Sequence, residues 1–317
     1  MTQLDELAFV LMAAGGAADS EKPGSHLLYV DPKTSSLVSK YWSGGDEELG
    51  QPETIAESVR LNSKASYVIG QSIRFIVYIS SSDELRVSEF DSDSDEWFDD
   101  EAIPHYKVHP QGHVCAVLFP NDQIRIIFQD SSQHFNLLHK VDESWSSSII
   151  PVEPTAGSPI GSWICDNQLH VFYVSAKDNC LHYVVEEASG SWNDVALPTC
   201  VLDTLKPKRL AVLPGVTAEK LFQVYVMSEA NTFWNFAAET KELEKLGKMD
   251  GKKFVPDNSE ECCRRICGGY GYSNYSYSNY APSYTNINYS PHNTYINYHP
   301  RYTHNSYHYN FHNYFRI

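Results

Sequence analysis

The chain has 317 residues, with 24 Lys and Arg against 40 Asp and Glu, which gives a formal net charge of −16 at pH 7. This length allows two average domains or one long repeat protein. The acidic balance argues against nucleic acid as a partner, and no apolar run approaches the roughly 20 residues that span a bilayer, so we expect no membrane insertion.

The first segment, MTQLDELAFVLMAAGG, has a short apolar run behind two acidic residues, Asp5 and Glu6. A secretory signal requires a basic lead. We therefore expect no classical signal peptide and a cytoplasmic or leaderless-secreted protein. We interpret Ala8 to Ala14 as an inner strand, followed by HLLYVDPKTSSLVSKYW, which predicts a hairpin that ends on Trp42.

Three further units share one pattern: an apolar strand, a polar turn, a second strand and a closing tryptophan. They read IRFIVYISSSDELRVSEFDSDSDEW, IRIIFQDSSQHFNLLHKVDESW and LHVFYVSAKDNCLHYVVEEASGSW, and they end at Trp97, Trp145 and Trp192. The spacings are 145 − 97 = 48 and 192 − 145 = 47. A period in the forties built from short strands is typical of a propeller blade.

A fifth unit, KRLAVLPGVTAEKLFQVYVMSEANTFWNFAAE, has two more apolar strands. The sequence thus predicts an all-β protein, a β-propeller with five recognisable blades of about 47 residues, over residues 1–256. The charged segment ETKELEKLGKMDGKK after the fifth unit is helix-like, and we interpret it as a linker. The cysteines within strand-like sequence predict buried thiols in a reducing compartment; they are Cys115, Cys165, Cys180 and Cys200.

Ten acidic residues fall within residues 83–101, including the run DSDSDEW. This run resembles the start of a calcium loop, but Glu96 stands at its glycine position and Ala102 at its terminal glutamate position. We expect a solvated turn between strands there, and no metal site.

Residues 257–317 form a Cys/Tyr/Asn/His-rich, low-complexity tail, which contains 13 of the 21 tyrosines after residue 267. The segment has too few aliphatic residues to offset the entropy of ordering, so we expect a disordered C-terminal tail. His304, His308 and His312 have helical spacing, but their neighbours disfavour a helix and we expect no metal there. A frameshift or mis-assigned exon is the alternative, and it would also account for a missing sixth blade.

The unit from Ile124 to Trp145 resembles the repeats of the fungal fucose-specific lectin family, six-bladed β-propellers with repeats of the type IRVYYQ…NxIREY…W. The resemblance covers five repeats, about residues 8–240, in a degenerate copy. The family motif has an Arg, a Glu twelve residues later and an aromatic about twenty later; Arg125 and Trp145 match its ends. The resemblance implies pockets for L-fucose between adjacent blades, no catalysis, no cofactor, and a possible homodimer.

The residue types of such a pocket explain its chemistry. A guanidinium donates hydrogen bonds to sugar hydroxyls and a carboxylate accepts hydrogen bonds from them. An aromatic face covers the apolar C–H side of the sugar. Each element alone is weak, so a pocket requires all three.

None of the five units has the Arg and the Glu in strict register. In the third unit Leu137 stands at the Glu position, and in the second unit Glu89 is in place while Arg74 lies two or three residues from the Arg position. The candidate carbohydrate-binding residues are Arg74, Glu89 and Trp97 in the second unit, and Arg125 and Trp145 in the third.

The sequence therefore predicts a carbohydrate-binding lectin for L-fucose, with fucosylated glycans or glycoproteins as partners. The alternative is a degenerate propeller that has lost sugar binding and acts as a protein-interaction platform. A sialidase-like glycosidase would require the turn Ser-x-Asp-x-Gly-x-Thr-Trp, which is absent, as are a nucleophile elbow and a phosphate loop. We expect no enzyme activity.

Overall fold

The computed structural model describes eleven stretches, all of which belong to the same compact unit. They are residues 3–19, 23–44, 47–70, 73–119, 123–141, 144–187, 189–197, 205–214, 222–237, 242–251 and 253–257. The expectations for the tail after Asp257, and for Cys200, lie outside them.

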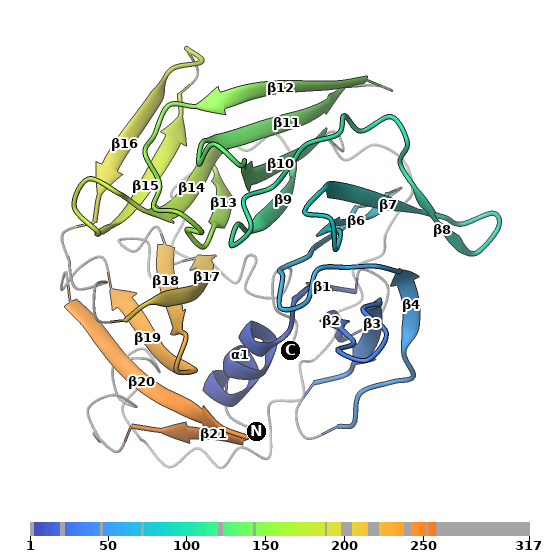
Figure 1. The fold of residues 1–317 in the computed structure, drawn as a ribbon. Helices are drawn as coiled ribbons and strands as arrows, with labels where there is room; N and C mark the ends of the chain where they lie inside the picture. Colours follow the sequence, from blue (N-terminus) through green and yellow to red (C-terminus); the bar gives the residue numbers. More distant parts are fainter. Residues whose placement is uncertain are drawn as a thin grey trace, which may run out of the picture. The chain divides into compact units, whose positions relative to one another are not determined.

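Five antiparallel sheets stand around a common centre, and each sheet is one blade (Figure 1). Blade 1 contains β1 (Gly15–Ala18), β2 (Ser25–Val30), β3 (Leu37–Trp42) and β4 (Glu53–Ala56). Blade 2 contains β5 (Ser66–Ile69), β6 (Arg74–Ile79), β7 (Leu85–Asp91) and β8 (Glu96–Asp99). Blade 3 contains β9 (Val114–Phe119), β10 (Gln123–Gln129), β11 (Phe135–Val141) and β12 (Ser144–Ile150).

The last two blades follow in chain order. Blade 4 contains β13 (Gly161–Cys165), β14 (Gln168–Val174), β15 (Leu181–Glu186) and β16 (Trp192–Ala196). Blade 5 contains β17 (Pro207–Pro214), β18 (Phe222–Ser228), β19 (Thr232–Ala237), β20 (Glu242–Asp250) and β21 (Lys253–Pro256). The first strand of each blade lies nearest the centre (Figure 1). The predicted five-bladed all-β propeller is confirmed.

The second strand of each unit is almost continuously apolar because both of its faces are buried between blades. In β10, Ile126 packs into the cluster shared with blade 2, and Ile127 packs into the cluster shared with blade 4. Both side chains are fully buried. Successive side chains of a strand point to opposite faces of the sheet. The face therefore determines which of the two inter-blade clefts a side chain enters.

The turns between the second and third strands repeat a hydrogen-bonding device. A side-chain oxygen at the start of the turn accepts the backbone N–H four residues later: Ser80 from Glu84, Asp130 from His134, and Ser228 from Thr232. Such local bonds favour a turn over continued strand. The DSDSDEW run is likewise a turn, between β7 and β8, in which Asp91 accepts the backbone N–H of Asp93.

The linkers between blades cross over these turns near the centre. Val59 forms an isolated bridge with Ser80, Val108 one with Asp130, and Pro154 one with Ser175. Each linker thus packs on the turn of the blade that it enters, which places consecutive linkers side by side around the centre.

The N-terminal segment differs from its prediction. Residues 8–14 were expected to form a strand, but α1 (Gln3–Met12) is a helix that contacts β1 and β21. Ala, Leu and Met favour a helix, and a short apolar run fits either structure until its packing decides. The helix lies between blade 5 and blade 1, where a sixth blade would stand (Figure 1). Phe9 of α1 packs on the buried Trp42, with their ring centroids 4.9 Å apart.

The interpretation of ETKELEKLGKMDGKK as a helix-like linker was also wrong. Residues 242–250 form β20, which pairs with β19 and with β21. Leu246 is buried there, with 1% of its surface exposed. β20 forms backbone hydrogen bonds with β19, which would otherwise be an open edge of blade 5. The free energy gained by this pairing outweighs the helical preference of Glu, Leu and Lys.

Two local findings complete the fold. Cys115 and Cys165 are free, but Cys180 is disulfide-bonded, so the expectation of a free thiol is wrong at that position. No helix in the described stretches is long and apolar enough to cross a membrane.

Candidate functional site

The structure separates the two sets of candidate residues that the sequence grouped together. Glu89 pairs with Phe75 and Phe98, whereas Trp97 pairs with its neighbour Phe90. Adjacent positions of a strand face opposite sides. Glu89 therefore faces blade 3, while Trp97 faces blade 1.

The same division holds in blade 3. Arg125 of β10 pairs with His139, and Lys140 of β11 pairs with Trp145 of β12. Since His139 and Lys140 are consecutive, Arg125 and Trp145 lie on opposite faces of the sheet. Each belongs to a different inter-blade cleft.

The cleft between blades 1 and 2 contains Trp97 and Arg74. The Trp97 Nε1–H donates a hydrogen bond to Glu53 Oε1 of blade 1 at 2.8 Å, and its ring lies 5.7 Å from that of Tyr67. The Arg74 guanidinium lies over the ring of Phe90, 5.2 Å from its centroid, and Phe90 in turn packs on Trp97. An indole, a carboxylate and a guanidinium thus meet there, with Glu53 in place of Glu89.

The cleft between blades 2 and 3 contains Glu89 and Trp145. Lys140 Nζ forms ion pairs with Glu89 and with Asp100, the latter at 3.1 Å. Trp145 Nε1–H donates to the same Asp100 carboxylate at 3.0 Å, and Phe75 packs on the indole. Burial alone would lower the pKa of Lys140, but the hydrogen bonds to the two carboxylates outweigh it and raise that pKa. The charged groups of this cleft therefore bind one another.

The cleft between blades 3 and 4 contains Arg125. Its Nη1 forms an ion pair with Glu186 of β15, the adjacent blade. The guanidinium carbon lies 4.0 Å from the ring centroid of Phe119, while Arg125 Nε is buried and has no hydrogen-bond partner in the described stretches. Trp192 follows as the strand partner of Glu186 and packs against the apolar cluster between the two blades.

His139 adds a polar group beside this ion pair. Burial, followed by the positive charge of Arg125, lowers the pKa of His139 below its ordinary value. The imidazole is therefore neutral at pH 7, with one nitrogen able to donate and the other able to accept a hydrogen bond. The cleft between blades 3 and 4 combines a cation, an anion, a neutral imidazole and an indole.

The cleft between blades 4 and 5 is aromatic. Tyr183 stacks on Phe172, with the ring centroids 5.5 Å apart, and contacts Phe222 and His170. The His170 Nδ1 atom is buried and finds no partner among the residues that the structure describes, and burial lowers the pKa of that ring.

Sequence reasoning missed Glu186 and Trp192 because it took all three groups from one unit. The available signal was the repeat itself, since Trp192 lies 192 − 145 = 47 residues after Trp145. A pocket between adjacent blades draws its groups from consecutive units. Counting from Arg125 into the next unit would have reached both residues.

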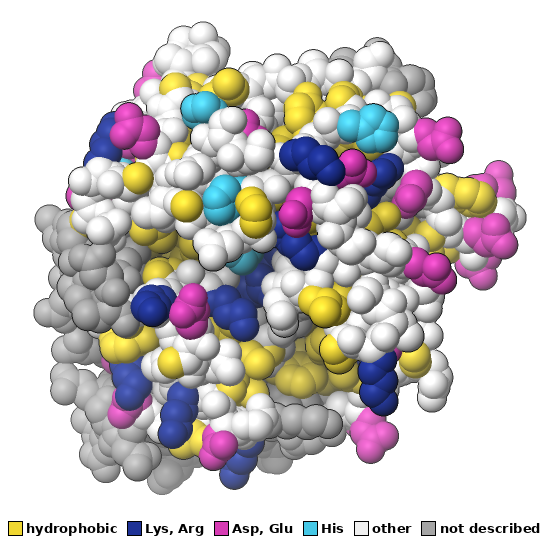
Figure 2. All heavy atoms as spheres, in the orientation of Figure 1, with side chains coloured by type: hydrophobic (Ala, Val, Ile, Leu, Met, Phe, Trp, Pro, Cys, Tyr) yellow, Lys and Arg dark blue, Asp and Glu magenta, His cyan; other side chains and the backbone are white. Residues whose placement is uncertain are grey.

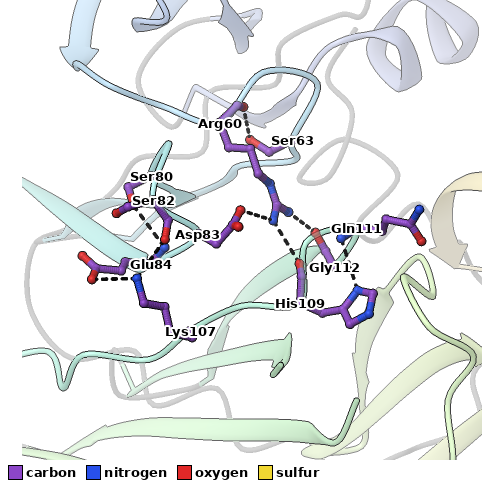
Figure 3. Close-up of polar contacts among 10 residues, drawn as sticks. All are labelled: Arg60, Ser63, Ser80, Ser82, Asp83, Glu84, Lys107, His109, Gln111 and Gly112. Carbon is purple, nitrogen blue, oxygen red and sulfur yellow. Dashed lines mark hydrogen bonds and ion pairs between the residues drawn. The ribbon is translucent and has the colours of Figure 1, made fainter. Parts of the chain in front are cut away.

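A separate concave region lies at the centre, where the linkers meet. Arg60, from the linker into blade 2, donates hydrogen bonds to Asp83 Oδ1 at 3.0 Å, to His109 O at 2.9 Å and to Gly112 O (Figure 3). The Arg60 guanidinium thus connects the turn at Asp83 with the linker that contains His109 and Gly112. These contacts fix one edge of the concave region, which we call the central hollow.

Arg60→Ala is expected to lower the free energy of unfolding by about 2–3 kcal/mol, because two carbonyls and one carboxylate lose their donor in a half-buried setting. Arg86→Ala is the matched control, since Arg86 is 34% exposed in its surface pair with Glu84 and its removal should cost much less than that of Arg60. Urea unfolding measures both. Equal losses in the two variants would show that Arg60 does not tie the linkers together.

Neither a family model nor a curated protein matches the chain. Solved structures do match it. The lectin AofleA from Arthrobotrys oligospora shares 17% identity over 78% of this chain and 72% of its own, with a TM-score of 0.56. The fucose-specific lectin from Aleuria aurantia shares 13% over 77% and 80%, with a TM-score of 0.55. SapL1 lectin, solved with alpha methyl fucoside, shares 13% over 77% and 80%, with a TM-score of 0.56.

These similarities confirm, at the level of the fold, the resemblance that the repeat predicted. The Aleuria aurantia lectin is described as a six-bladed β-propeller. The present chain has five blades in its described stretches, with α1 at the sixth position.

Proposed function

We propose that the chain is a carbohydrate-binding lectin whose main sugar site is the cleft between blades 3 and 4. The observation that supports this most strongly is the meeting of Arg125 and Glu186 from adjacent blades, with Trp192 beside the carboxylate. A guanidinium donor, a carboxylate acceptor and an indole face are the three groups that a small neutral sugar requires.

The proposed sugar is L-fucose, carried on fucosylated glycans or glycoproteins. A methyl-bearing sugar has an apolar face for Trp192 and vicinal hydroxyls for the charged pair. The solved lectins of the same fold include fucose-specific examples, which supports this choice. The cleft between blades 1 and 2, with Arg74, Trp97 and Glu53, has the same set of groups and is the proposed second site.

The affinity should be modest. In the sugar-free protein Arg125 already pairs with Glu186, and their side chains are only 17% and 24% exposed. A sugar must separate this pair and replace its ionic contact by hydrogen bonds from neutral hydroxyls. The free energy gained on binding is reduced by that exchange.

Calorimetric titration with α-methyl fucoside tests the assignment. Glu186→Gln keeps the shape of the side chain but removes its charge, and it is expected to weaken binding by about ten-fold, as one charge-assisted hydrogen bond becomes neutral. Glu89→Gln is the matched control in the neighbouring cleft and should leave the affinity unchanged. A loss in Glu89→Gln alone would move the site to blades 2 and 3.

The interaction-platform alternative also has an observation in its favour. The charged groups of the cleft between blades 2 and 3 already satisfy one another through Lys140. In addition, Phe98 and Ile149 on the outer strands of blades 2 and 3 are 49% and 58% exposed. A parent protein that binds no fucoside at all would favour this alternative.

A further inference from the structure

The central hollow is distinct from the inter-blade clefts. It has a volume of about 550 Å³ and is lined by four consecutive linkers, through residues 60–63, 110–113, 155–157 with Pro159, and 206–208. Two turns add Asn179 and Glu229 to its lining. Figure 2 shows Lys and Arg side chains, in dark blue, gathered around the hollow near the middle of the ring.

The charges at this hollow oppose the charge of the chain as a whole. Although the net charge is −16, the ionisable lining residues include Arg60, His113, Lys206 and Lys208, with Glu229 as the carboxylate among them. Arg60 is engaged with Asp83 and two carbonyls, as described above. Within the part of the chain that the structure describes, Lys206 and Lys208 form no ion pair, although Glu229 favours the charged form of Lys208.

Arg209 lies directly behind the lining. Only 4% of its surface is exposed, and its Nε has no hydrogen-bond partner among the described residues. Its Nη1 contacts His113 Nδ1 at 3.4 Å, so it is joined to a residue that lines the hollow. Within the described stretches, no carboxylate forms an ion pair with Arg209, although a buried guanidinium is costly without one.

Lys64 is the second cation behind the lining. Its Nζ donates to Leu210 O at 3.3 Å and forms no ion pair with any described carboxylate. Because Leu210 follows Arg209 in the chain, this hydrogen bond places Lys64 beside Arg209. Burial, followed by the charge of Arg209, lowers the pKa of Lys64 to about 8. Lys208 also has its pKa lowered, by burial first and then by Arg209, with Glu229 acting in the opposite direction.

His113 completes the set as a neutral donor. Burial, followed by Arg209 and Lys64, holds the pKa of His113 well below its ordinary value, so the ring is uncharged at pH 7. A guanidinium has no acceptor, so His113 Nδ1 must accept from Arg209 and the proton must be on Nε2. The second nitrogen is then a donor.

We propose that the central hollow binds a small oxyanion of the phosphate or sulfate class, held by Lys208 with His113 as a neutral donor, while Arg209 and Lys64 add positive charge from directly behind the lining. The grouping of three cations and one imidazole supplies donors and positive charge in excess of the lining carboxylate of Glu229. Charges behind the lining still attract an anion, because they act through a protein interior in which screening is weak. Binding would offset the repulsion among the cations.

Titration of the full chain with inorganic phosphate tests this proposal, at constant ionic strength and in a buffer without other oxyanions. Saturable binding with one site per chain and a rise in melting temperature are expected, whereas chloride should give neither. Lys208→Gln is expected to weaken phosphate binding by about ten-fold through the loss of one charge-assisted contact. Lys33→Gln removes an exposed charge in a blade 1 turn and should change nothing.

The dependence on pH gives a second readout. Lys64 loses its charge as the pH rises through about 8, so phosphate affinity should fall between pH 7 and 9, and binding at pH 8 should be accompanied by proton uptake. Lys64→Met should abolish that proton uptake. Its melting temperature without phosphate should be no lower than that of the parent, since the folded state no longer holds a disfavoured charge.

The phosphate titration tests the oxyanion site independently of the lectin proposal. The absence of saturable phosphate binding in the parent protein would overturn the oxyanion site, whatever the fucoside titration gives. Equal weakening in Lys208→Gln and Lys33→Gln would also overturn it, because the effect would then follow net charge rather than position.

Discussion

Trp42→Ala is expected to lower the free energy of unfolding by about 3–5 kcal/mol, the typical cost of removing a large buried aromatic side chain. Trp42 is 1% exposed and packs between blade 1 and Phe9 of α1. The substitution removes the surface on which the helix rests, at the position where a sixth blade would complete the ring. Urea unfolding, followed by circular dichroism, measures the loss.

Phe98→Ala is the control for this prediction, because Phe98 is 49% exposed on an outer strand and should cost less than about 1 kcal/mol. Deleting residues 1–12 should approach the effect of Trp42→Ala. If the deletion left stability unchanged, α1 would be only an appendage, and the five blades would form the stable unit by themselves.

Arg125→Ala is expected to weaken fucoside binding by ten- to a hundred-fold, because it removes a charge-assisted donor and leaves the Glu186 carboxylate unpaired. Arg125→Lys should restore only part of the affinity, since a point charge cannot replace a planar fork. Calorimetric titration measures both variants. Arg74→Ala, in the cleft between blades 1 and 2, should leave the stronger binding event intact.

The converse result would identify the other cleft. If Arg74→Ala removed the stronger binding event and Arg125→Ala did not, the main site would lie between blades 1 and 2. Melting temperatures of the variants separate a loss of contacts from a loss of fold, and Arg125→Lys, which keeps the positive charge beside Glu186, is the control for the latter.

The repeat period predicted the blades because a propeller imposes the same strand lengths and turns on every unit. Trp97, Trp145 and Trp192 each lie in the outermost strand of a blade, as their spacing requires. The same signal failed at α1 and β20. In both segments, contacts with strands that are distant in sequence determine the secondary structure. A local sequence pattern does not contain these contacts.

The candidate site was predicted only in its residue types. Arg125 and Trp145 share a unit, but the strand register sends them into different clefts, and the partners of Arg125 come from the next blade. A two-residue periodicity decides the face, so an error of one residue moves a side chain to the opposite cleft. The central cations were not predicted at all, because Lys64 and Arg209 are distant in sequence and meet only in the closed ring.

A crystal structure of the full chain with α-methyl fucoside tests the central claim most directly. We predict the sugar in the cleft between blades 3 and 4, with Arg125 and Glu186 each in contact with its hydroxyls and no longer paired directly, and with its apolar face on Trp192. A fucoside bound in another cleft or in the central hollow would contradict this assignment, as would empty density in the cleft at a saturating concentration of the sugar.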